Sequence, residues 1–284
     1  MKLEIRKNVF LKDRYFLLEL AAPSAVKAAS PGQFLHMRME DSCDPFLRRP
    51  FSIHDVVKNH RKGSCVIKIL YEVIGKGTEL LSQKKVSAEV DALGPLGRGF
   101  DLKTIAPHEK IYIVAGGMGV APLFFLAKRL TEVRSQKSEV RKTVVLLGAK
   151  TKNHILCEKE FKNLGCDVQI ATEDGSKGFK GRVTGLFKEI LLRAKSPASP
   201  AGRAASPAGR HEPSTICACG PKAMLAVISE IAHLHRVRAH VSLEEFMGCG
   251  LGVCLGCTTR TTSGYKRICH DGPVFNTEEI IWRE

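Results

Sequence analysis

The chain reads Ile111-Tyr112-Ile113-Val114-Ala115-Gly116-Gly117-Met118-Gly119-Val120-Ala121-Pro122 at the point where its hydrophobic pattern changes. A continuous apolar run bounded by turn residues predicts a strand that is buried on both faces. A helix predicted over residues 121–133 follows the glycine turn, and Pro122 suits its first turn. Glycines in such a turn let a dinucleotide pyrophosphate approach the backbone and the positive end of the helix. The stretch therefore predicts a nucleotide-binding α/β domain.

The alternation of strand and helix patterns continues toward the C-terminus. We expect strand 143–147, helix 154–164, strand 167–171, strand 214–219 and helix 222–235. Alternation of this kind predicts a parallel sheet covered by helices.

Residues 1–103 follow a different pattern. Short alternating apolar runs, broken by turn residues, occupy residues 9–11, 16–20, 34–39 and 65–71. Short strands at that spacing predict a small antiparallel barrel. The expected fold class is α/β plus all-β, with domains at residues 1–103, 104–240 and 241–284.

The composition limits the classes of function. With 284 residues and 44% hydrophobic content, the chain can bury two moderate cores. A net charge of +15 raises nucleic acid as a partner, but Lys and Arg are scattered, and only four Tyr and one Trp are present for base stacking. The N-terminus has no apolar signal region, and no apolar window is long enough to cross a bilayer. We therefore expect a cytoplasmic protein that binds neither nucleic acid nor membrane.

One segment matches neither a strand nor a helix pattern. Residues 193–213 contain an imperfect Ala-Ser-Pro-Ala-Gly-Arg repeat. Pro, Gly and Ser at that density cannot bury a core, so we predict a disordered surface insertion in the second domain.

Four cysteines near the C-terminus have the spacing of metal ligands. Cys249, Cys254, Cys257 and Cys269 form C-x4-C-x2-C…C, the ligand spacing of a plant-type [2Fe–2S] cluster, and the intervening glycines permit a tightly curled loop. A structural zinc site is the alternative, although zinc usually takes two C-x2-C pairs or mixed Cys and His ligands. Disulfides are disfavoured because nothing in the chain is typical of a secreted protein. We assign a packing role to Cys43, Cys65, Cys157, Cys166 and Cys217.

Two segments of the N-terminal domain carry candidate phosphate ligands. Arg49-Pro50-Phe51-Ser52 places a guanidinium and a hydroxyl near each other, as a phosphate and a flavin ring edge require. Gly77 and Thr78 follow the strand that ends at Glu72 and offer backbone amides, a hydroxyl and a helix N-terminus to a pyrophosphate. Either segment by itself also fits a surface ion pair or a capped turn.

Together, and followed by residues 94–100, these segments resemble the flavin-binding barrel of the ferredoxin–NADP reductase superfamily. The turn at residues 116–122 and Cys219-Gly220-Pro221 resemble the nicotinamide side of the same superfamily. The run from Ser242 to Cys257, completed by residues 269–275, is similar to the electron-transfer subunits of NAD-dependent dihydroorotate dehydrogenase, type B. Phe246 departs from that family, where we expect a basic residue.

The resemblance implies a function in pyrimidine biosynthesis. Such a subunit takes electrons from the FMN of a catalytic subunit, passes them through its [2Fe–2S] cluster to its FAD, and reduces NAD+ as substrate. The implied assembly is a heterotetramer of two copies of each subunit, and the base that oxidises dihydroorotate lies in the partner. The implied FAD contacts are Arg49, Pro50, Phe51, Ser52, Leu70, Tyr71, Glu72, Gly77 and Thr78. The implied nicotinamide contacts are Gly116, Gly117, Gly119 and Cys219.

Two other functions remain open at this point. A related reductase subunit, of the sulfhydrogenase or ferredoxin:NADP transhydrogenase kind, shares the barrel and the nicotinamide domain. A zinc-dependent assembly module needs no flavin. The choice between NAD and NADP is also open, because Lys150 and Lys152 follow the second strand of the nicotinamide domain.

Overall fold

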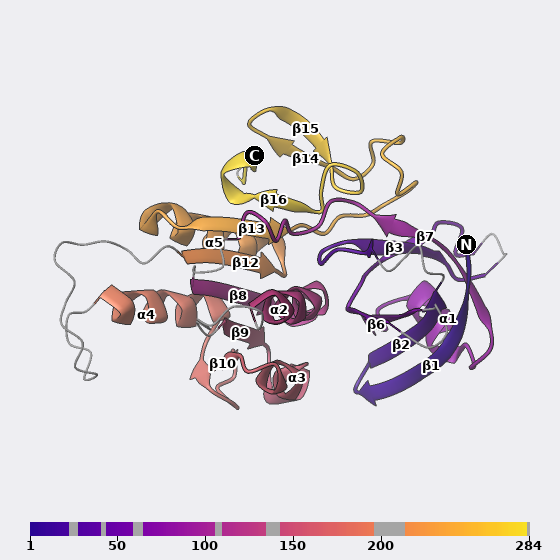
Figure 1. Cartoon of the computed structure of the whole chain (residues 1–284), viewed down its shortest axis with the longest axis horizontal. Coiled ribbons are helices and arrows are strands. Elements are labelled where there is room, and N and C mark those ends of the chain that lie inside the picture. Colours follow the sequence, from indigo (N-terminus) through magenta and orange to yellow (C-terminus); the bar gives the residue numbers. More distant parts are fainter. Residues whose placement is uncertain are drawn as a thin grey trace.

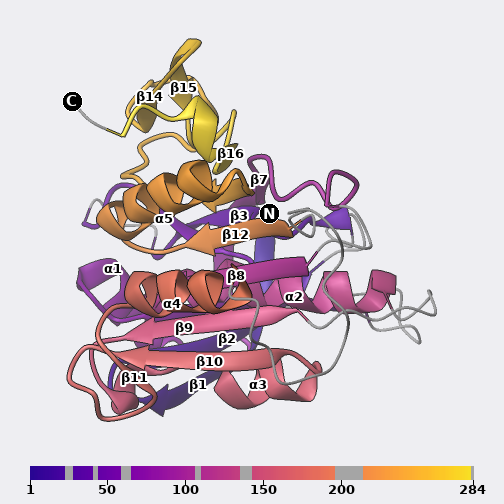
Figure 2. The same ribbon diagram turned by 90° about the vertical axis from the view of Figure 1, so that its left-hand side faces the viewer.

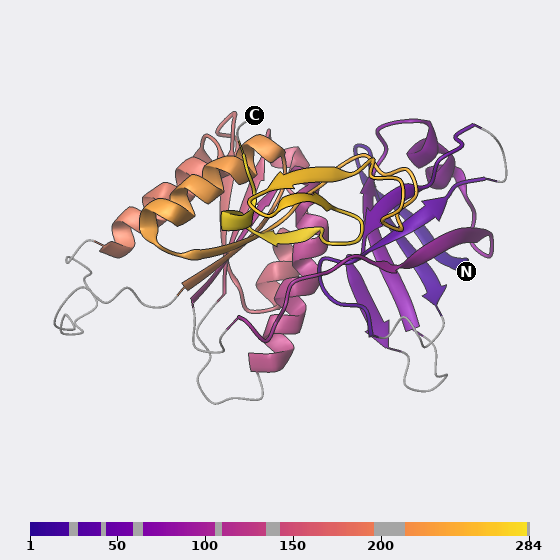
Figure 3. The ribbon, with the colours of Figure 1, turned by 90° about the horizontal axis from the view of Figure 1, so that it is seen from above.

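The computed structural model describes residues 1–22, 28–40, 44–58, 65–105, 110–134, 143–195 and 214–282. Three parts are visible in Figure 1: a strand-rich part on the right, a sheet with helices on the left, and a small C-terminal module above both. Seen from above in Figure 3, the C-terminal module lies across the junction of the other two parts. The exact domain boundaries stay a prediction.

The N-terminal strands form a seven-stranded antiparallel sheet in the order β4-β3-β7-β1-β2-β6-β5. They are β1 (Lys2–Lys12), β2 (Tyr15–Ala22), β3 (Phe34–Arg38), β4 (Arg49–Ser52), β5 (Asp55–Lys58), β6 (Cys65–Glu72) and β7 (Glu89–Leu96), and helix α1 (Lys76–Gln83) lies between β6 and β7. The chain crosses from one edge to the other after β4, because the amide of Ile53 donates to Gln33 and the amide of His54 donates to Lys68 of β6. This crossing joins the two edges into the predicted antiparallel barrel.

The second sheet has the order β11-β10-β9-β8-β12-β13-β16, and all its neighbours are parallel except β13 and β16. Its strands are β8 (Lys110–Gly116), β9 (Val144–Ala149), β10 (Asp167–Thr172), β11 (Phe179–Lys180), β12 (Ser214–Cys219), β13 (Arg238–Ser242) and β16 (Val274–Asn276). Figure 2 shows this order from β16 near the top down to β10. The parallel α/β sheet predicted from the sequence is confirmed.

Helices cover both faces of this sheet, as its apolar strands require. They are α2 (Val120–Arg134), α3 (Glu158–Asn163), α4 (Val183–Lys195) and α5 (Lys222–His235). In β8, Ile111 and Ile113 face the core shared with α2 and α3, whereas Tyr112 and Val114 face the core shared with α4 and α5. The alternation of side chains along one strand therefore builds two cores.

Helix α2 also packs against the barrel and so connects it to the parallel sheet. Its Phe125 is buried in the barrel core. Lys128 forms an ion pair with the buried Asp55 at 2.7 Å, and the ring of His54 is hydrogen-bonded to the carbonyl of Ala121 at 2.9 Å. Both contacts come from the segment around β5, so this side of the barrel is fixed against the nucleotide-binding domain.

The C-terminal module contains a hairpin of β14 (Thr258–Thr261) and β15 (Gly264–Arg267), and then adds β16 to the edge of the large sheet. It also touches the segment that follows β7, because a Cβ at Gly97 would lie 2.7 Å from the carbonyl oxygen of Gly272. The barrel residue Phe34 is part of the same core as Cys257 and Phe275. The module is therefore packed against both larger parts.

The structure corrects three local predictions. The helix predicted over 154–164 is a 3-10 turn (Lys152–His154) followed by α3, because Cys157 adopts a left-handed φ of 60° between them. The short strand predicted at 9–11 is the end of the longer β1. Residues 193–195, the start of the predicted insertion, belong to α4, and residues 196–213 lie outside the described residues.

We expect Phe34→Ala to destabilise the chain strongly, because Phe34 is 3% exposed and fills the core between the barrel and the C-terminal module. Removal of a buried phenyl ring costs about 3–5 kcal/mol in the free energy of unfolding. Phe10→Ala is the matched control, because Phe10 lies on the barrel surface with 57% of its surface exposed. Chemical denaturation checks both variants, and equal losses of stability would contradict the shared core.

Candidate cluster and nucleotide sites

The cysteine loop, residues 249–257, lies directly on the barrel. Gly250 and Gly252 have φ values of +71° and +80°, a region that favours glycine. A Cβ at Gly250 would be 2.4 Å from Nδ1 of His36, which belongs to β3. The loop can therefore approach the barrel this closely only with glycine at this position.

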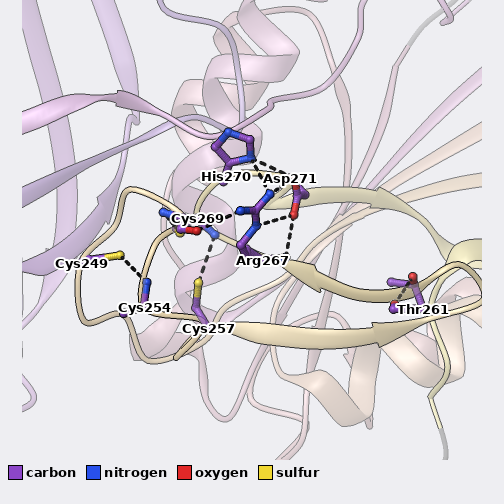
Figure 4. Close-up of polar contacts among 10 residues, drawn as sticks. Cys249, Cys254, Cys257, Thr261, Arg267, Cys269, His270 and Asp271 are labelled. Atoms are coloured by element: carbon purple, nitrogen blue, oxygen red, sulfur yellow. Dashed lines mark hydrogen bonds and ion pairs between the residues drawn. The ribbon is translucent and has the colours of Figure 1, made fainter.

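Backbone amides of the loop point at three of the four sulfurs, as Figure 4 shows in part. The amides of Leu251 and Cys254 donate to Sγ of Cys249 at 3.3 and 3.5 Å. The amide of Gly252 donates to Sγ of Cys269 at 3.2 Å, and the amide of Cys269 donates to Sγ of Cys257 at 3.4 Å. Amide donors stabilise negative charge on sulfur, which is the state that binds iron.

The β14–β15 hairpin brings the fourth cysteine to the loop. Thr258 pairs with Arg267 in the hairpin, so the residues just outside the two strands also meet. The amide of Ile268 donates to the carbonyl of Cys257 at 2.9 Å, which places Cys269 beside Cys257. The turn is closed by the hydroxyl of Thr261, which donates to the carbonyl of Gly264 (Figure 4).

The thiols fall into two contacting pairs, Cys249 with Cys254 and Cys257 with Cys269. Burial raises the pKa of Cys249, but hydrogen bonds from the amides of Cys254, Leu251 and Val253 outweigh it and bring the pKa to about 6. Burial raises the pKa of Cys269 to about 12, with a further contribution from the adjacent Cys257. The loop thus combines an outer thiol that ionises readily with an inner, desolvated pair.

This arrangement fits a two-iron cluster. A [2Fe–2S] cluster takes four cysteine ligands, two on each iron, and the two sulfur pairs match that division. A structural zinc ion would instead need its ligands around one point.

An arginine joins the cluster loop to the end of β15 (Figure 4). The guanidinium of Arg267 contacts Asp271 at 3.0 and 3.2 Å and donates to the carbonyl of Gly252 at 2.9 Å. The hydrogen bonds from Arg267 hold the pKa of Asp271 well below its usual range. Because the pair joins Gly252 of the loop to Asp271, which closely follows Cys269 in the chain, it fixes the loop relative to the last cysteine.

The predicted FAD contacts come together at one end of the barrel. Arg49 lies against the start of α1, because a Cβ at Gly77 would be 3.4 Å from Cγ of Arg49. Phe51 packs edge-on against Tyr71 with ring centroids 6.0 Å apart. Strands β4 and β6 and helix α1 therefore gather the predicted flavin residues, and their contacts to FAD stay a prediction.

Thr78 is engaged in the turn before α1. Its hydroxyl accepts from the amides of Ile74 at 3.0 Å and Gly75 at 3.2 Å, and it donates to the carbonyl of Gly75 at 2.9 Å. The side chain therefore shapes the turn that presents the helix N-terminus. Its predicted contact with a phosphate of FAD stays a prediction.

The predicted nicotinamide residues lie at the point where the strand order reverses, between β8 and β12. Open α/β sheets bind ligands at such a switch point. A Cβ at Gly119 would be 2.1 Å from the carbonyl oxygen of Cys219, so the two turns touch through their backbones. Gly117 has a φ of +54°, and a Cβ there would meet no atom within 4 Å, so this turn is open to a ligand.

Glu244 is a candidate residue that the sequence analysis did not identify. Its carboxylate is close enough to raise the pKa of Cys219, in addition to the larger effect of burial, which together bring it to about 12. The pKa of Glu244 is itself raised by the atoms that crowd its carboxyl and by the charges of Glu245 and Glu72. The charge of Glu244 thus acts on Cys219, a predicted nicotinamide residue, and the charge of Glu72, a predicted flavin residue, acts on Glu244, a coupling that no local pattern signals.

Other predicted residues have ordinary structural roles. His270 is hydrogen-bonded to Asp271 at 2.9 Å and His54 to Ala121, as expected for non-ligand histidines. Cys65 and Cys217 are buried, whereas Cys43 lies outside the described residues. Phe246, the departure from the basic residue expected there, is 94% exposed. Among the described helices, none has the length and apolar character to span a membrane.

Comparison with known protein families gives matches for the cysteine module and for the nucleotide-binding domain. A model of the iron–sulfur cluster binding domain of dihydroorotate dehydrogenase B matches residues 244–281. A model of the oxidoreductase NAD-binding domain matches residues 113–230.

Full-length relatives and solved structures agree with these matches. The electron transfer subunits of dihydroorotate dehydrogenase B (NAD(+)) from Desulforamulus reducens and Geobacillus kaustophilus are 40% and 36% identical, covering 94% and 99% of this chain and 92% and 98% of their own. The structure of an NADH-dependent reduced ferredoxin-NADP oxidoreductase has a TM-score of 0.79 at 29% identity, covering 99% of this chain and 90% of its own. A ferredoxin NADP+ reductase from Neisseria gonorrhoeae, with bound FAD and NADP, shares the fold with a TM-score of 0.62 at 14% identity over 81% of this chain and 89% of its own.

We expect Arg267→Gln to speed the loss of the cluster, because it removes the link between Asp271 and Gly252. Iron content and visible absorbance during a chelator challenge measure the effect. Asp271 has a lowered pKa, so the link is present at any pH above the ordinary Asp pKa of about 3.9 and is lost only as the pH falls through the depressed value. Arg260→Gln is the control, because Arg260 is exposed on the same hairpin. Equal rates for both variants would contradict a role of the Arg267–Asp271 pair.

Proposed function

The chain belongs to the family of electron transfer subunits of dihydroorotate dehydrogenase B (NAD(+)), and from this premise we propose its route of electrons and its partner. It is an oxidoreductase subunit that uses FAD, a [2Fe–2S] cluster and NAD. We propose that it passes electrons from the FMN of a catalytic subunit through the cluster and FAD to NAD+. One observation carries this proposal. The four cysteines form two pairs, Cys249 with Cys254 and Cys257 with Cys269, in a loop that contacts the barrel next to the predicted flavin strand.

The order of the groups follows from the number of electrons that each can exchange. When bound, the cluster exchanges one electron at a time, NAD+ accepts two electrons together, and a flavin does both. The flavin must therefore stand between the other two. In the fold, the cysteine loop contacts β3 of the barrel, and helix α2, which follows the Gly116–Gly119 turn, packs into the barrel core through Phe125. Both segments therefore adjoin the part that carries the predicted flavin residues, which supports this order.

The proposed roles of the residues follow the same order. Cys249, Cys254, Cys257 and Cys269 hold the cluster. The barrel segments around Arg49, Tyr71 and Gly77 hold FAD, and the turns at Gly117 and Cys219 hold NAD+. Backbone amides would hold the cluster through its cysteine sulfurs, and the charge of Arg49 would hold FAD. These contacts are already in place before electron transfer, so the protein would supply a fixed geometry rather than acid–base catalysis.

The exposed tip of the cysteine loop supports the position of the catalytic partner. We call this surface the loop rim, and its exposed apolar side chains are Leu251, Val253 and Leu255 of the loop and Phe246, which lies just before the loop. Apolar side chains clustered beside an electron-transfer group mark a contact surface. We propose that an FMN-containing catalytic subunit docks here, with two copies of each subunit in the complex. A cytoplasmic location is also part of the proposal.

A second function shares much of the site. The full-length similarity to an NADH-dependent reduced ferredoxin-NADP oxidoreductase favours a transhydrogenase-type reductase as the second candidate. Lys150 is exposed after β9, where a 2′-phosphate would be read. Turnover with NAD+ against NADP+, and copurification with a dihydroorotate-oxidising subunit, distinguish the two functions.

Replacing any one of the four cluster cysteines by Ala should abolish the cluster signal and the partner-coupled reduction of NAD+. Oxidation of NADH with an artificial acceptor should survive in the same variants, because the predicted flavin residues lie on separate strands. Cys65→Ala serves as the control, since Cys65 is buried in the barrel core. Full partner-coupled turnover in a cluster-free variant would refute the proposed route.

Val253→Glu should weaken the complex with the catalytic subunit at least tenfold, or about 1.4 kcal/mol. The physical reason is that the change buries a charge in the contact, since Val253 is 78% exposed in the free subunit. Leu192→Glu is the control, because Leu192 is an exposed residue of α4, remote from the loop in Figure 1. Titration calorimetry measures both affinities, and an unchanged affinity of the Val253 variant would remove the loop rim from the contact.

A further inference from the structure

Strand β3 carries a buried histidine that the roles above do not use. His36 is 0% exposed. Neither of its ring nitrogens has a hydrogen-bond partner of good geometry among the described residues, although burial, which lowers the pKa of His36, is partly offset by the nearby backbone carbonyls of Arg48 and Cys249. Buried polar groups are nearly always paired, so an imidazole in this state requires an explanation.

The ring lies between the cysteine loop and the predicted flavin strand. On one side, the three nearest atoms to a Cβ at Gly250 would all belong to the His36 ring, with Nδ1 at 2.4 Å. Along the sheet, His36 pairs with Pro50 of β4 and with Leu93 of β7. His36 therefore connects the segment that follows Cys249 to the strand of Arg49–Ser52.

The other side chains of β3 show which way the His36 side chain faces. Leu35 and Met37 point into the barrel core, whereas Phe34 points into the core of the C-terminal module. His36 is on the same face of the strand as Phe34, because side chains alternate along a strand. The barrel thus presents one apolar and one hydrogen-bonding side chain to the module that carries the cysteines.

We propose that His36 is a positioning residue for electron transfer, whose ring supports the Cys249–Gly250 segment and supplies a buried N–H to the sulfur-rich loop. This inference rests on the proposed function. Reduction adds one electron to the cluster, and no bond of His36 is made or broken. A hydrogen-bond donor near the sulfurs stabilises the reduced, more negative form, so the ring raises the reduction potential of the cluster.

The test compares His36→Leu, which removes the donor, with His36→Gln, which retains an N–H. A redox titration of the cluster in the full chain, followed by electron paramagnetic resonance, gives its midpoint potential and spectrum. We expect the Leu variant to hold about tenfold less reduced cluster at a given potential, a shift of ~59 mV for one electron. The Gln variant should retain most of the parent potential.

His54→Leu is the matched control, because His54 is also buried but is bonded to α2. Its cluster potential should equal that of the parent. NADH-driven reduction of the flavin should be the same in the parent and both His36 variants, since His36 is not among the predicted FAD contacts.

A parent-like potential and spectrum in the Leu variant would overturn the proposal, because the ring would then only fill space. If the Leu variant assembles no cluster, the Gln variant decides, since a parent-like potential supports the donor role and a lowered one overturns it. Absence of a two-iron signal in the parent itself would instead refute the proposed function.

Discussion

Strand β3 is buried on both faces, and the relation between the three parts of the molecule depends on this. Its inner side chains, such as Leu35 and Met37, close the barrel core. Its outer side chains, Phe34 and His36, lie under the C-terminal module. Because side chains alternate strictly, a slip of one residue would exchange the two sets and leave the cysteine loop on a wrong surface. The register of one short strand therefore determines whether the cluster lies on the barrel.

The site is assembled from close backbone contacts more than from long side chains. Gly250 brings the cysteine loop onto β3, and Gly119 brings the two turns of the nucleotide-binding domain together. Such contacts allow little relative movement, since a dense interior resists sliding. For an electron-transfer protein this rigidity has a direct use, because the proposed cofactors then keep constant separations without a conformational step. The charge of Glu244 also acts on Cys219, one of the predicted nicotinamide residues.

Much of this architecture follows from local sequence, and the exceptions have physical reasons. β12 and α5 have the predicted bounds, because a continuous apolar run and a helical period are separated by Gly220-Pro221. The helix predicted over residues 154–164 is wrong because the left-handed Cys157 interrupts it, a conformation that its residue type does not signal. The spacing of the cysteines predicts their loop, but the burial of His36 depends on Gly250, which is distant in sequence and near only in the fold.

The last strand of the chain has one more consequence. β16 pairs with β13 and so covers what would be the open side of the large sheet, while the opposite side ends in β11, which is only two residues long. An uncovered strand offers a row of free amides and carbonyls to any other chain and invites aggregation. The segment that follows the cluster ligands therefore also protects the nucleotide-binding domain from intermolecular strand pairing, and a chain that ends before β16 would expose the edge of β13 to such pairing.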